Sequence, residues 1–580
     1  MQKSGEEPTA MTIENAGSPE AHHDRKTQLQ SVDLIEDEYP VKLSWRSWLV
    51  VFIICFVNMS QIFVVTAAGS VIAFIIRDLG DASISGWIIQ GPLLMQAVLS
   101  PIVGRLSDVI DRRYLVSIPP LIAFAGAVIS ARAESMSVLI GGGILIGFTL
   151  STVAIIEAVP AEVLPLKYRA LASGLGFVGG ATGGLLGVLG AGGVTNTDAG
   201  GWRSIFWIQA AFHLTSSVSL LIFYHPKRHP DYPDMTLKEI VWACDPIGSA
   251  LFIEGSLLLL LAFDWSSAYP WGNVHVAIPI AIGGASLLLF CFYEWKGRSD
   301  GIVAHSLFKG SPNFMLSVFA FAVEGWIFYS AVNSITPQIV LNLGFEDTSW
   351  QISIRQLSYN LVSLFACLPI TWYATKYKDL KNPTIVCFVL FLIVCICYAT
   401  ITPAMNHAQI GYNVIAGIGQ AGPLILIVAL VQFTAPHQYL SCATGLAFSA
   451  RAIGGAFGSA VLDAIINGKL NSKYEPSILS AATGAGLSAS AVPALLAALA
   501  AGDSTAIAAV PGINESIIAA VVNASHSAYA SAYRLAWVSI IPFVVLAIVA
   551  IFFLKGVKEQ MTEKVEATVE HVPDKLGMEK

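Results

Sequence analysis

The sequence predicts an all-α polytopic membrane protein with fourteen transmembrane helices, built as two related six-helix halves and one inserted helix pair. Of the 580 residues, 55% are hydrophobic and 12% are charged, and the mean hydropathy is +0.67, well above that of a water-soluble protein. Apolar runs of about 20 residues, enough to cross a bilayer as a helix, recur along the chain. One segment of the first half also recurs in the second half.

The predicted spans are separated mostly by short polar connections. Their ranges are 47–70, 84–103, 114–132, 137–158, 168–193, 203–224, 246–264, 274–294, 313–335, 351–373, 383–402, 410–433, 441–466 and 533–554. The predicted regions are a disordered cytoplasmic tail (1–45), the first half (46–225), the inserted pair (240–295), the second half (310–466 and 533–556), an extracellular loop (467–532) and a cytoplasmic tail (557–580).

The distribution of positive charge predicts the orientation, because cytoplasmic loops retain Lys and Arg. With the N-terminus inside, the loops after spans 2, 4, 6, 8 and 10 hold Arg105, Arg112, Arg113, Lys167, Arg169, Lys227, Arg228, Lys238, Lys296, Arg298, Lys309, Lys376, Lys378 and Lys381. The opposite short loops hold Arg77 and Arg132, with Arg203 at the edge of a span. Both termini are therefore expected in the cytoplasm.

The long loop over 467–532 is expected outside, and it contains N-glycosylation sequons at Asn514 and Asn523. Charge and sequons thus favour the same side of the membrane. The loop is rich in Ala and Ser, but a further span through it would place the basic residues after span 14 on the wrong side. Gly and Pro residues interrupt the stretch, so we expect loop helices there.

An internal repeat relates the two halves. When the sequence is shifted by 271 positions, "PLKYRALASGLGFVGGATGGLLG" (165–187) falls on "PHQYLSCATGLAFSARAIGGAFG" (436–458). Span 5 is then the counterpart of span 13. Spans 1–6 and 9–14 are therefore the two halves, and spans 7 and 8 are the inserted pair.

Glycines recur every four residues in two registers of span 5. They are Gly176, Gly180 and Gly184, and Gly179, Gly183 and Gly187. Such a stripe lets another helix approach closely. One interpretation is tight packing alone, and the other is a sliding contact of span 5 with its counterparts at the interface between the halves.

The stretch "GRLSDVIDRR" (104–113) connects spans 2 and 3. It resembles the signature loop of the major facilitator superfamily, G-x-x-x-D-[RK]-x-G-[RK]-[RK], with matches at Gly104, Asp108, Arg112 and Arg113. Positions 109 and 111 depart from the pattern, since they hold Val and Asp. We interpret the motif as a gating latch on the cytoplasmic side. In this interpretation the Gly ends a helix, the Asp caps helix ends across the two halves, and the two Arg residues lie at lipid headgroups. An anchor that only follows the positive-inside rule is the alternative.

Five further stretches are similar to the fungal trichothecene efflux pump family, which lies among the fourteen-span drug:proton antiporters and close to the fungal siderophore-iron transporters. They are "EVLPLKYRALASG", "GGWRSIFWIQ", "DPIGSALF", "DWSSAYPWGNVHV" and "SARAIGGAFG". The resemblance covers roughly residues 40–465 and 533–556 and implies the major facilitator fold. Fourteen-span antiporters usually carry R-x-x-Q-G in span 4, but Gly143 and Ile146 occupy those positions here.

Ionisable residues inside the spans are candidates for transport, because a charge at mid-membrane costs ~2.5–3.5 kcal/mol even on an insertion scale. Glu324 lies halfway along span 9, and the resemblance implies that the first and fourth helices of each half line the cavity. Glu324 is the first proton-coupling candidate, and a structural role for its carboxylate is the alternative. Glu157 in span 4 is the second, as a gate partner or a snorkelling acid. Glu254 in the inserted pair favours a structural role, and Arg451 is expected to pair with an acid in the bundle.

Neutral polar side chains on the cavity-lining spans are candidates for substrate contact. These are Asn58 and Gln61 in span 1, Tyr329 and Asn333 in span 9, and Gln420 in span 12. Their spacing places Asn58 and Gln61 on one helix face. Hydrogen bonds between helices explain such residues equally well.

Other function classes find no support in the sequence. It contains no G-x-x-x-x-G-K-[ST] phosphate loop, so ATP is not the expected fuel. Proline residues beside His225 and His229 prevent the helix that would align them, and no metal-ligand set is complete. We expect no enzyme activity, no metal, no cofactor and no nucleic-acid partner.

The sequence therefore predicts a proton-coupled secondary transporter that exports a hydrophobic small molecule, such as a trichothecene-like toxin or a drug. Its expected partners are the lipid bilayer, the small-molecule substrate and protons. A monomer in the plasma membrane is expected, with the vacuolar membrane as the alternative. Siderophore-iron uptake by proton symport is the alternative function, and a non-transporting membrane sensor is the alternative of another class.

Overall fold

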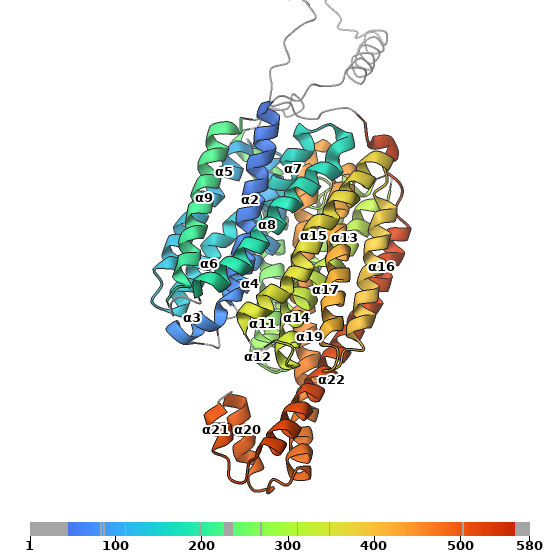
Figure 1. Ribbon diagram of the computed structural model, residues 1–580. Coiled ribbons are helices and arrows are strands. Elements are labelled where there is room, and N and C mark those ends of the chain that lie inside the picture. The colour runs from blue at the N-terminus through green and yellow to red at the C-terminus, as the bar shows by residue number, and fades with distance from the viewer. Residues whose placement is uncertain are drawn as a thin grey trace, which may run out of the picture.

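The computed structural model describes residues 45–81, 84, 87–110, 112–195, 200–225, 236–266, 269–309, 311–346, 348–501 and 504–562. These residues form helices and turns, with no strand among them. Fourteen helical stretches are long and apolar enough to cross a membrane, which agrees with the predicted number of spans, and they lie side by side in one bundle (Figure 1). The predicted tails fall outside the described residues, apart from Trp45 and residues 557–562.

The first half contains six of the candidate spans. They are α2 (Trp45–Ser70), α4 (Trp87–Ser107), α5 (Arg112–Ala131), α6 with α7 (Met136–Ser151 and Val153–Val163), α8 (Arg169–Thr195) and α9 (Arg203–Phe223), with a short α3 (Ile72–Leu79) after α2. The span formed by α6 and α7 is interrupted at Thr152. Within this half α2 packs on α8, and α5 packs on α6 and α9.

The second half has the same plan with longer helices. Its spans are α13 (Asn313–Gly325) with the π-helix η5 (Trp326–Ile335) and α14 (Thr336–Asn342), then α15 (Ser349–Tyr377), α16 (Lys381–Tyr398), α17 with α18 (Asn406–Ala421 and Pro423–Thr434), α19 (Leu440–Gly484) and α22 (Glu515–Phe552). The short helix η6 (His437–Tyr439) precedes α19.

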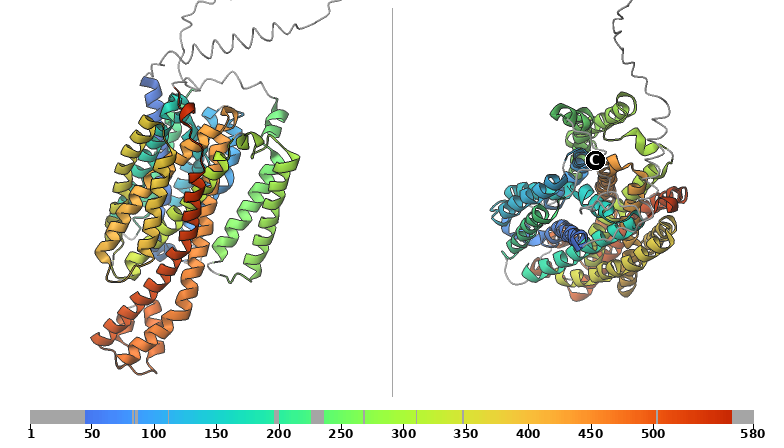
Figure 2. Two further views of the ribbon diagram at one scale, coloured as in Figure 1. Left: turned by 90° about the vertical axis from the view of Figure 1, so that its right-hand side faces the viewer. Right: turned by 90° about the horizontal axis from the view of Figure 1, so that it is seen from above.

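The inserted pair lies at one side of the bundle (Figure 2). It consists of α11 (Pro246–Trp265) and α12 (Val274–Phe292), preceded by α10 (Leu237–Ala243) and followed by η3 (Tyr293–Gly297) and η4 (His305–Phe308). α11 packs on α12 and also contacts α4 and α19. The pair therefore touches one helix from each half.

The described residues of the stretch 467–532, predicted as an outer loop, form a helical protrusion at the bottom of the bundle (Figure 1). α19 and α22 both run on into it, and α20 (Val492–Ala501) and α21 (Ser504–Ala508) connect them. The protrusion has an apolar core of its own, which includes Ile478, Leu487, Leu495, Val510 and Val521. Helices thus occur in the Ala- and Ser-rich stretch, as expected.

Two helix pairs join the halves, and the internal repeat relates them. α4 packs along α19, and α8 packs along α15. A Cβ added to Gly445 of α19 would lie 2.4 Å from Ser100 O, and a Cβ added to Gly174 of α8 would lie 2.6 Å from Thr371 Oγ1. Gly445 and Thr371 are the positions 271 residues after Gly174 and Ser100. The two close contacts are therefore repeat equivalents, as a duplicated half requires.

The glycine stripe of α8 serves packing inside the first half. A Cβ at Gly179 would lie 2.2 Å from Cys55 O, and one at Gly183 would lie 2.1 Å from Met59 O, both on α2. The interpretation that this stripe meets its counterparts between the halves is wrong, because α2 belongs to the same half. Close approach of two backbones needs glycine, since any side chain would occupy the space.

The contact of α8 with α2 predicts a selective effect of small substitutions. Gly183→Ala would force a methyl group into a backbone carbonyl, so we expect a loss of about 1–3 kcal/mol in stability and a lower melting temperature in fluorescence-detected size-exclusion chromatography. Gly190→Ala in the same helix is the control, because a Cβ there meets nothing within 4 Å. Equal melting temperatures for both variants would contradict the role assigned to this contact.

Candidate functional site

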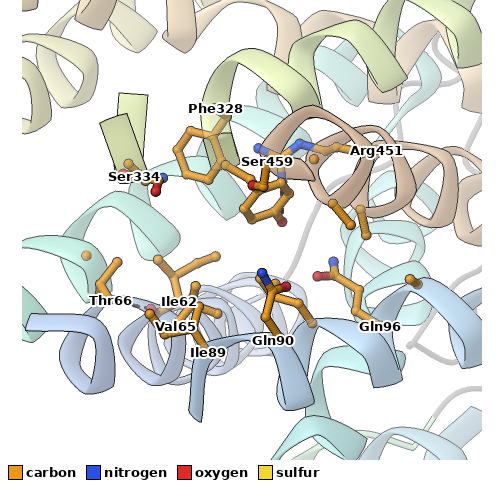
Figure 3. A pocket seen from close by; sticks show the side chains of 18 of the residues that line it. Ile62, Val65, Thr66, Ile89, Gln90, Gln96, Phe328, Ser334, Arg451 and Ser459 are labelled. Atoms are coloured by element: carbon orange, nitrogen blue, oxygen red, sulfur yellow. Dashed lines mark hydrogen bonds between the residues drawn. The ribbon is translucent and has the colours of Figure 1, made fainter. Parts of the chain in front are cut away.

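A cavity of about 1090 Å³ lies between the two halves. Side chains from both halves face each other across it, with Gln90 and Gln96 of α4 opposite Phe328 and Arg451 (Figure 3). The lining of α2 begins at Asn58, and the remaining lining positions of that helix lie towards its C-terminal end. The cavity therefore extends from the middle of the bundle towards the end opposite residues 104–113. We call the end with residues 104–113 the closed end and the other the open end.

The cavity wall combines aromatic and amide side chains. Its aromatic residues are Trp87, Phe177, Phe263, Tyr269, Trp271, Phe328, Tyr329, Tyr359 and Phe448. A concave, mainly apolar surface with a few polar groups is typical of sites for organic small molecules. The composition of the wall thus suits a hydrophobic or amphipathic ligand.

Glu157 and Asn58, both predicted site residues, meet on the cavity wall. Asn58 Nδ2 donates to Glu157 Oε1 at 3.1 Å. A Cβ at Gly176 would lie 2.9 Å from Asn58 Nδ2, so the glycine of α8 leaves space for this pair. Glu157 is half-buried and lines the cavity. The acid of α7 is therefore within reach of a molecule in the cavity.

Glu324 lies behind the cavity wall rather than on it. It is 0% exposed and is paired with Arg451, whose Nε lies 2.5 Å from Oε2 and whose Nη2 lies 3.0 Å from Oε1. Gln420 Nε2 donates to Glu324 Oε1 at 2.5 Å. Arg451 and Gln420 line the cavity whereas Glu324 does not. The expectation that Glu324 faces the cavity is therefore wrong for this conformation.

The neutral candidates all line the cavity but differ in what they bind. Arg451 Nη1 donates to the hydroxyl of Tyr329 at 2.8 Å, so Tyr329 and Gln420 both support the buried ion pair. Gln61 Nε2 donates to Thr149 O at 2.6 Å and joins α2 to α6 near the break at Thr152. Asn333 lies on the wall from η5.

Two further acids that were not predicted from the sequence lie on the cavity wall. Asp264 at the end of α11 and Asp463 of α19 both line the cavity. Tyr269 and Trp271, from the connection between α11 and α12, line it as well. The signal for Asp463 was present, since it is an acid in the otherwise apolar run "AVLDAII". The inserted pair, predicted to lie outside both halves, thus contributes part of the wall.

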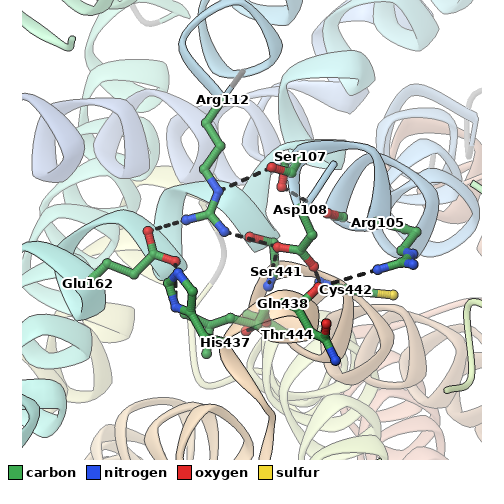
Figure 4. Close-up of polar contacts among 12 residues, drawn as sticks. Arg105, Ser107, Asp108, Arg112, Glu162, His437, Gln438, Ser441, Cys442 and Thr444 are labelled. Atoms are coloured by element: carbon green, nitrogen blue, oxygen red, sulfur yellow. Dashed lines mark hydrogen bonds and ion pairs between the residues drawn. The ribbon is translucent and has the colours of Figure 1, made fainter. Parts of the chain in front are cut away.

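Asp108 joins the halves at the closed end (Figure 4). Ser441 N donates to Oδ1 at 3.1 Å and Cys442 N donates to Oδ2 at 2.9 Å, so the carboxylate caps the first turn of α19. A negative charge is favourable at a helix N-terminus. Burial raises the pKa of Asp108 to about 6, which leaves the group ionised above pH 7.

Arginine residues surround this carboxylate. Arg112 Nη2 lies 3.0 Å from Asp108 Oδ1, and Arg112 also pairs with Glu162 of α7. Arg105 Nη1 donates to Gln438 O at 3.3 Å, and its guanidinium lies over the ring of Tyr439. Arg105 and Glu162 were not among the predicted site residues. We call the contacts of Arg105, Asp108 and Arg112 with Glu162, Gln438, Tyr439, Ser441 and Cys442 the latch.

Three details of the predicted motif need correction. Gly104 does not end a helix, because α4 continues to Ser107, and a Cβ at Gly104 would lie 2.5 Å from Ser441 O. The glycine permits close contact of α4 with α19 instead. Arg112 is buried in its ion pairs, and Arg113 Nη2 donates to Leu221 O at 2.6 Å. Both arginines therefore bind protein groups rather than headgroups. Asp111 lies outside the described residues.

A second layer of contacts lies between the latch and the cavity. Gln432 Nε2 of α18 donates to Glu157 O at 3.1 Å. Arg169 Nη1 of α8 donates to Gln432 O at 2.9 Å. Gln432 therefore joins α18 of the second half to α7 and α8 of the first half, next to Glu157.

The two sequon asparagines lie in the helical protrusion, and both are exposed. Asn514 Oδ1 accepts a hydrogen bond from Ile517 N at 2.8 Å and so caps α22. Asn523 lies within α22. Glycosylation at either position stays a prediction.

The latch predicts that Asp108→Asn opens the closed end. Asparagine has one acceptor oxygen, whereas Asp108 accepts donors on both oxygens, so one N–H of α19 would face an NH₂ group. We expect a larger fraction of molecules with separated closed ends at pH 7.5, measured by electron-electron distances between spin labels at Tyr114 and Tyr377, which are 52% and 51% exposed.

The matched control for this experiment is Asp81→Asn. Asp81 is an exposed acid in the connection between α3 and α4, at the open end. Its replacement should leave the distance distribution unchanged. A wild-type distribution for the Asp108→Asn protein would show that the cap does not hold the halves together.

Comparison with known proteins places the chain in a family. Residues 51–459 match the model of the Major Facilitator Superfamily. Similar proteins include the MFS-type transporter prx5 of Penicillium rubens, 25% identical over 95% of this chain and 97% of the relative. The Trichothecene efflux pump TRI12 of Fusarium sporotrichioides is 24% identical over 89% of this chain and 86% of the relative.

A solved structure shows the same fold. The proton:xylose symporter XylE bound to 6-bromo-6-deoxy-D-glucose aligns with a TM-score of 0.52, at 12% identity, over 87% of this chain and 97% of that chain. The family model covers more than half of the sequence, and the helices form the two-halved bundle with a central cavity. The chain therefore belongs to the major facilitator superfamily of transporters.

Proposed function

We propose that this protein is a proton-coupled exporter of a hydrophobic or amphipathic small molecule, such as a toxin or drug. The observation that carries the proposal is the aromatic-lined cavity between the halves with the acid Glu157 on its wall. The cavity volume of about 1090 Å³ is at the upper end of the range for small-molecule sites. A polycyclic ligand of the size of a trichothecene would fit inside it.

Glu157 is the proposed proton carrier, in place of Glu324. Glu157 lines the cavity, where a proton and a substrate can compete for its carboxyl group. Its backbone carbonyl accepts from Gln432, a residue of the other half. A change of charge at Glu157 would therefore act next to a contact that must break when the closed end opens.

Glu324 is assigned a structural role. Removing its charge would leave Arg451 buried without a counter-ion, which is strongly unfavourable. The pair also orients Tyr329 and Gln420 on the cavity wall. Glu324 and Arg451 thus fix the positions of two side chains that line the cavity.

Export as the direction is supported by the relatives, and the proton gradient supplies enough energy for it. Relatives of this chain include a trichothecene efflux pump and the Acurin A biosynthesis cluster MFS-type transporter of Aspergillus aculeatus, 24% identical over 74% of this chain and 77% of the relative. One proton moving through ~100 mV and one pH unit releases about 3.7 kcal/mol. That energy supports a substrate gradient of several hundredfold.

The test is transport by purified protein in vesicles with an imposed pH gradient. We expect Glu157→Gln to abolish uphill transport of a labelled trichothecene, so that accumulation falls from up to several hundredfold towards unity, while downhill exchange persists. Glu254→Gln, which alters an exposed acid of α11, should behave as wild type. Glu324→Gln should instead lower the yield of folded protein.

Three results would contradict the proposal. Uphill transport by Glu157→Gln with the wild-type pH dependence would exclude Glu157 as the carrier. Folded Glu324→Gln that exchanges substrate but does not concentrate it would return that role to Glu324. Transport of a ferric hydroxamate instead of the trichothecene would favour siderophore uptake.

The proposed orientation places the closed end in the cytoplasm and the helical protrusion outside the cell. Among the described residues, most Lys and Arg side chains of the short loops lie at the closed end, whereas Arg132 and Arg203 lie at the open end; the positive-inside rule favours the closed end as the cytoplasmic face. An epitope inserted after the exposed Pro511 should therefore bind antibody on intact cells, while tags at either terminus should need permeabilisation. Surface labelling of a terminal tag would contradict this orientation.

A further inference from the structure

Two buried carboxyl groups lie outside the cavity, at the closed end of the inserted pair. Asp245 directly precedes α11 and is 0% exposed, and Glu294 lies in η3, which follows α12, and is 3% exposed. Neither residue takes part in the cavity or in the latch. Buried acids of this kind need either a partner or a proton.

One oxygen of each carboxyl group has a clear partner. Asp245 Oδ1 accepts from Gly248 N at 3.1 Å and lies 3.5 Å from Arg298 Nη1. Glu294 Oε2 accepts from Val303 N at 3.2 Å. The other two oxygens, Asp245 Oδ2 and Glu294 Oε1, are buried and have no hydrogen bond of regular geometry among the described residues, and the side chain of Tyr293 also interacts with the Asp245 carboxylate.

Asp245 Oδ2 and Glu294 Oε1 share one small space. A Cβ at Gly301 would lie 2.7 Å from Asp245 Oδ2 and 2.7 Å from Glu294 Oε1. A Cβ at Gly248 would also touch both, at 2.1 and 2.8 Å. The glycines thus leave room for the two carboxyl groups to come close to each other, and neither of these oxygens carries a hydrogen atom when both groups are ionised. A single proton removes this conflict, since the O–H of one carboxyl donates to the other.

Among the described residues, Arg298 is the only Lys or Arg residue that forms an ion pair with this carboxyl pair. Arg298 is the nearest cation, and its Nε lies 2.9 Å from Asp300 Oδ1. Its guanidinium also lies over the ring of Trp242. The other titratable groups that face the pair or its neighbours are Tyr293, His305, Cys244, Cys442 and, beyond them, Arg105. Arg298 is shared between Asp245 and Asp300 and carries a single positive charge. It therefore cannot neutralise Asp245 and Glu294 together, and one of these two carboxyl groups needs a proton.

A chain of contacts links the carboxyl pair to the latch. Val303 binds Glu294, and the carbonyl of the preceding Ile302 accepts from Cys442 Sγ at 3.3 Å. Cys442 N in turn donates to Asp108 Oδ2 at 2.9 Å. On the other side, Arg105 Nε donates to Ala243 O at 3.0 Å, two residues before Asp245. The 298–305 segment therefore lies between the pair and the first turn of α19.

We propose that Asp245 and Glu294 form a proton-binding site, separate from the cavity, whose occupied form stabilises the latch. With the proton bound, the two carboxyl groups hold the 298–305 segment against α19. Without it, two negative charges face each other, Glu294 moves away from Asp245, and Val303 and Ile302 move with it. Because the closed form binds the proton more tightly, its stability is present at low pH and is lost as the pH rises.

The test follows the closed end of the full-length protein in lipid nanodiscs, with spin labels at Tyr114 and Tyr377 and the native cysteines replaced except Cys442, which is buried and donates to Ile302 O. It needs no substrate and is therefore independent of the proposed export. Measurements run from about pH 7 to pH 9, the range documented for buried glutamates and above the pKa of Asp108. The closed-to-open ratio of the labelled parent should fall by up to tenfold per pH unit where one proton is released.

Glu294→Gln should abolish this response and stay closed across the range, because Gln keeps the shape and can donate to Asp245 without ionising. Asp245→Asn, which can still cap Gly248, is the second variant and should also lose the response. Glu254→Gln on the same inserted pair is the control and should titrate as the parent. Infrared spectroscopy at neutral pH should show a protonated carboxyl band that disappears in Glu294→Gln.

Three other outcomes would contradict the proposed proton-binding site. A Glu294→Gln protein that opens with the parent's pH dependence would place the sensor elsewhere. A closed-to-open ratio that no longer depends on pH in Glu254→Gln would show that a Gln anywhere in the inserted helix pair abolishes the response non-specifically. A shift of the ratio by Na⁺ at fixed pH would mean that the carboxyl groups hold a metal cation instead of a proton.

Discussion

The first turn of α19 presents backbone N–H groups that have no partner within their own helix, and the other half of the protein supplies the acceptor. Asp108 accepts from both Ser441 and Cys442, and Gly104 lets α4 come close enough for this contact. α19 also lines the cavity and holds Arg451. The capped helix end therefore joins the two halves at one end of the bundle, while the cavity extends towards the other.

The charges inside the bundle are arranged in two different ways. Arg451 and Glu324 neutralise each other by two short hydrogen bonds, with Tyr329 and Gln420 completing the network. This buried pair is a fixed part of the wall, since separating it would leave an unpaired charge in a low-dielectric environment. Glu157 has a neutral amide as its side-chain partner, so its charge can change without breaking an ion pair.

The inserted pair takes part in both functional regions of the molecule. At the open end, Asp264, Tyr269 and Trp271 contribute to the cavity wall. At the closed end, the segment that follows α12 contacts Cys442 next to the Asp108 cap. The hairpin therefore contributes to the cavity wall at one end and, through the segment after α12, contacts the latch region at the other.

The amino-acid sequence by itself determined the number of spans, the duplicated plan and the location of the latch motif. Each of these depends on local composition: a bilayer needs about 20 apolar residues per helix, close helix contacts need small residues at fixed spacing, and a cap needs a short acid. Only the tertiary structure decided which acid meets the cavity. Glu157 and Glu324 both lie in apolar spans, but Glu324 meets Arg451, which is 127 positions away, and helix rotation against such a distant neighbour leaves no trace in local composition. Asp245 and Glu294 are likewise brought together by the return of the α11–α12 hairpin, so their meeting depends on packing rather than on any pattern along the chain.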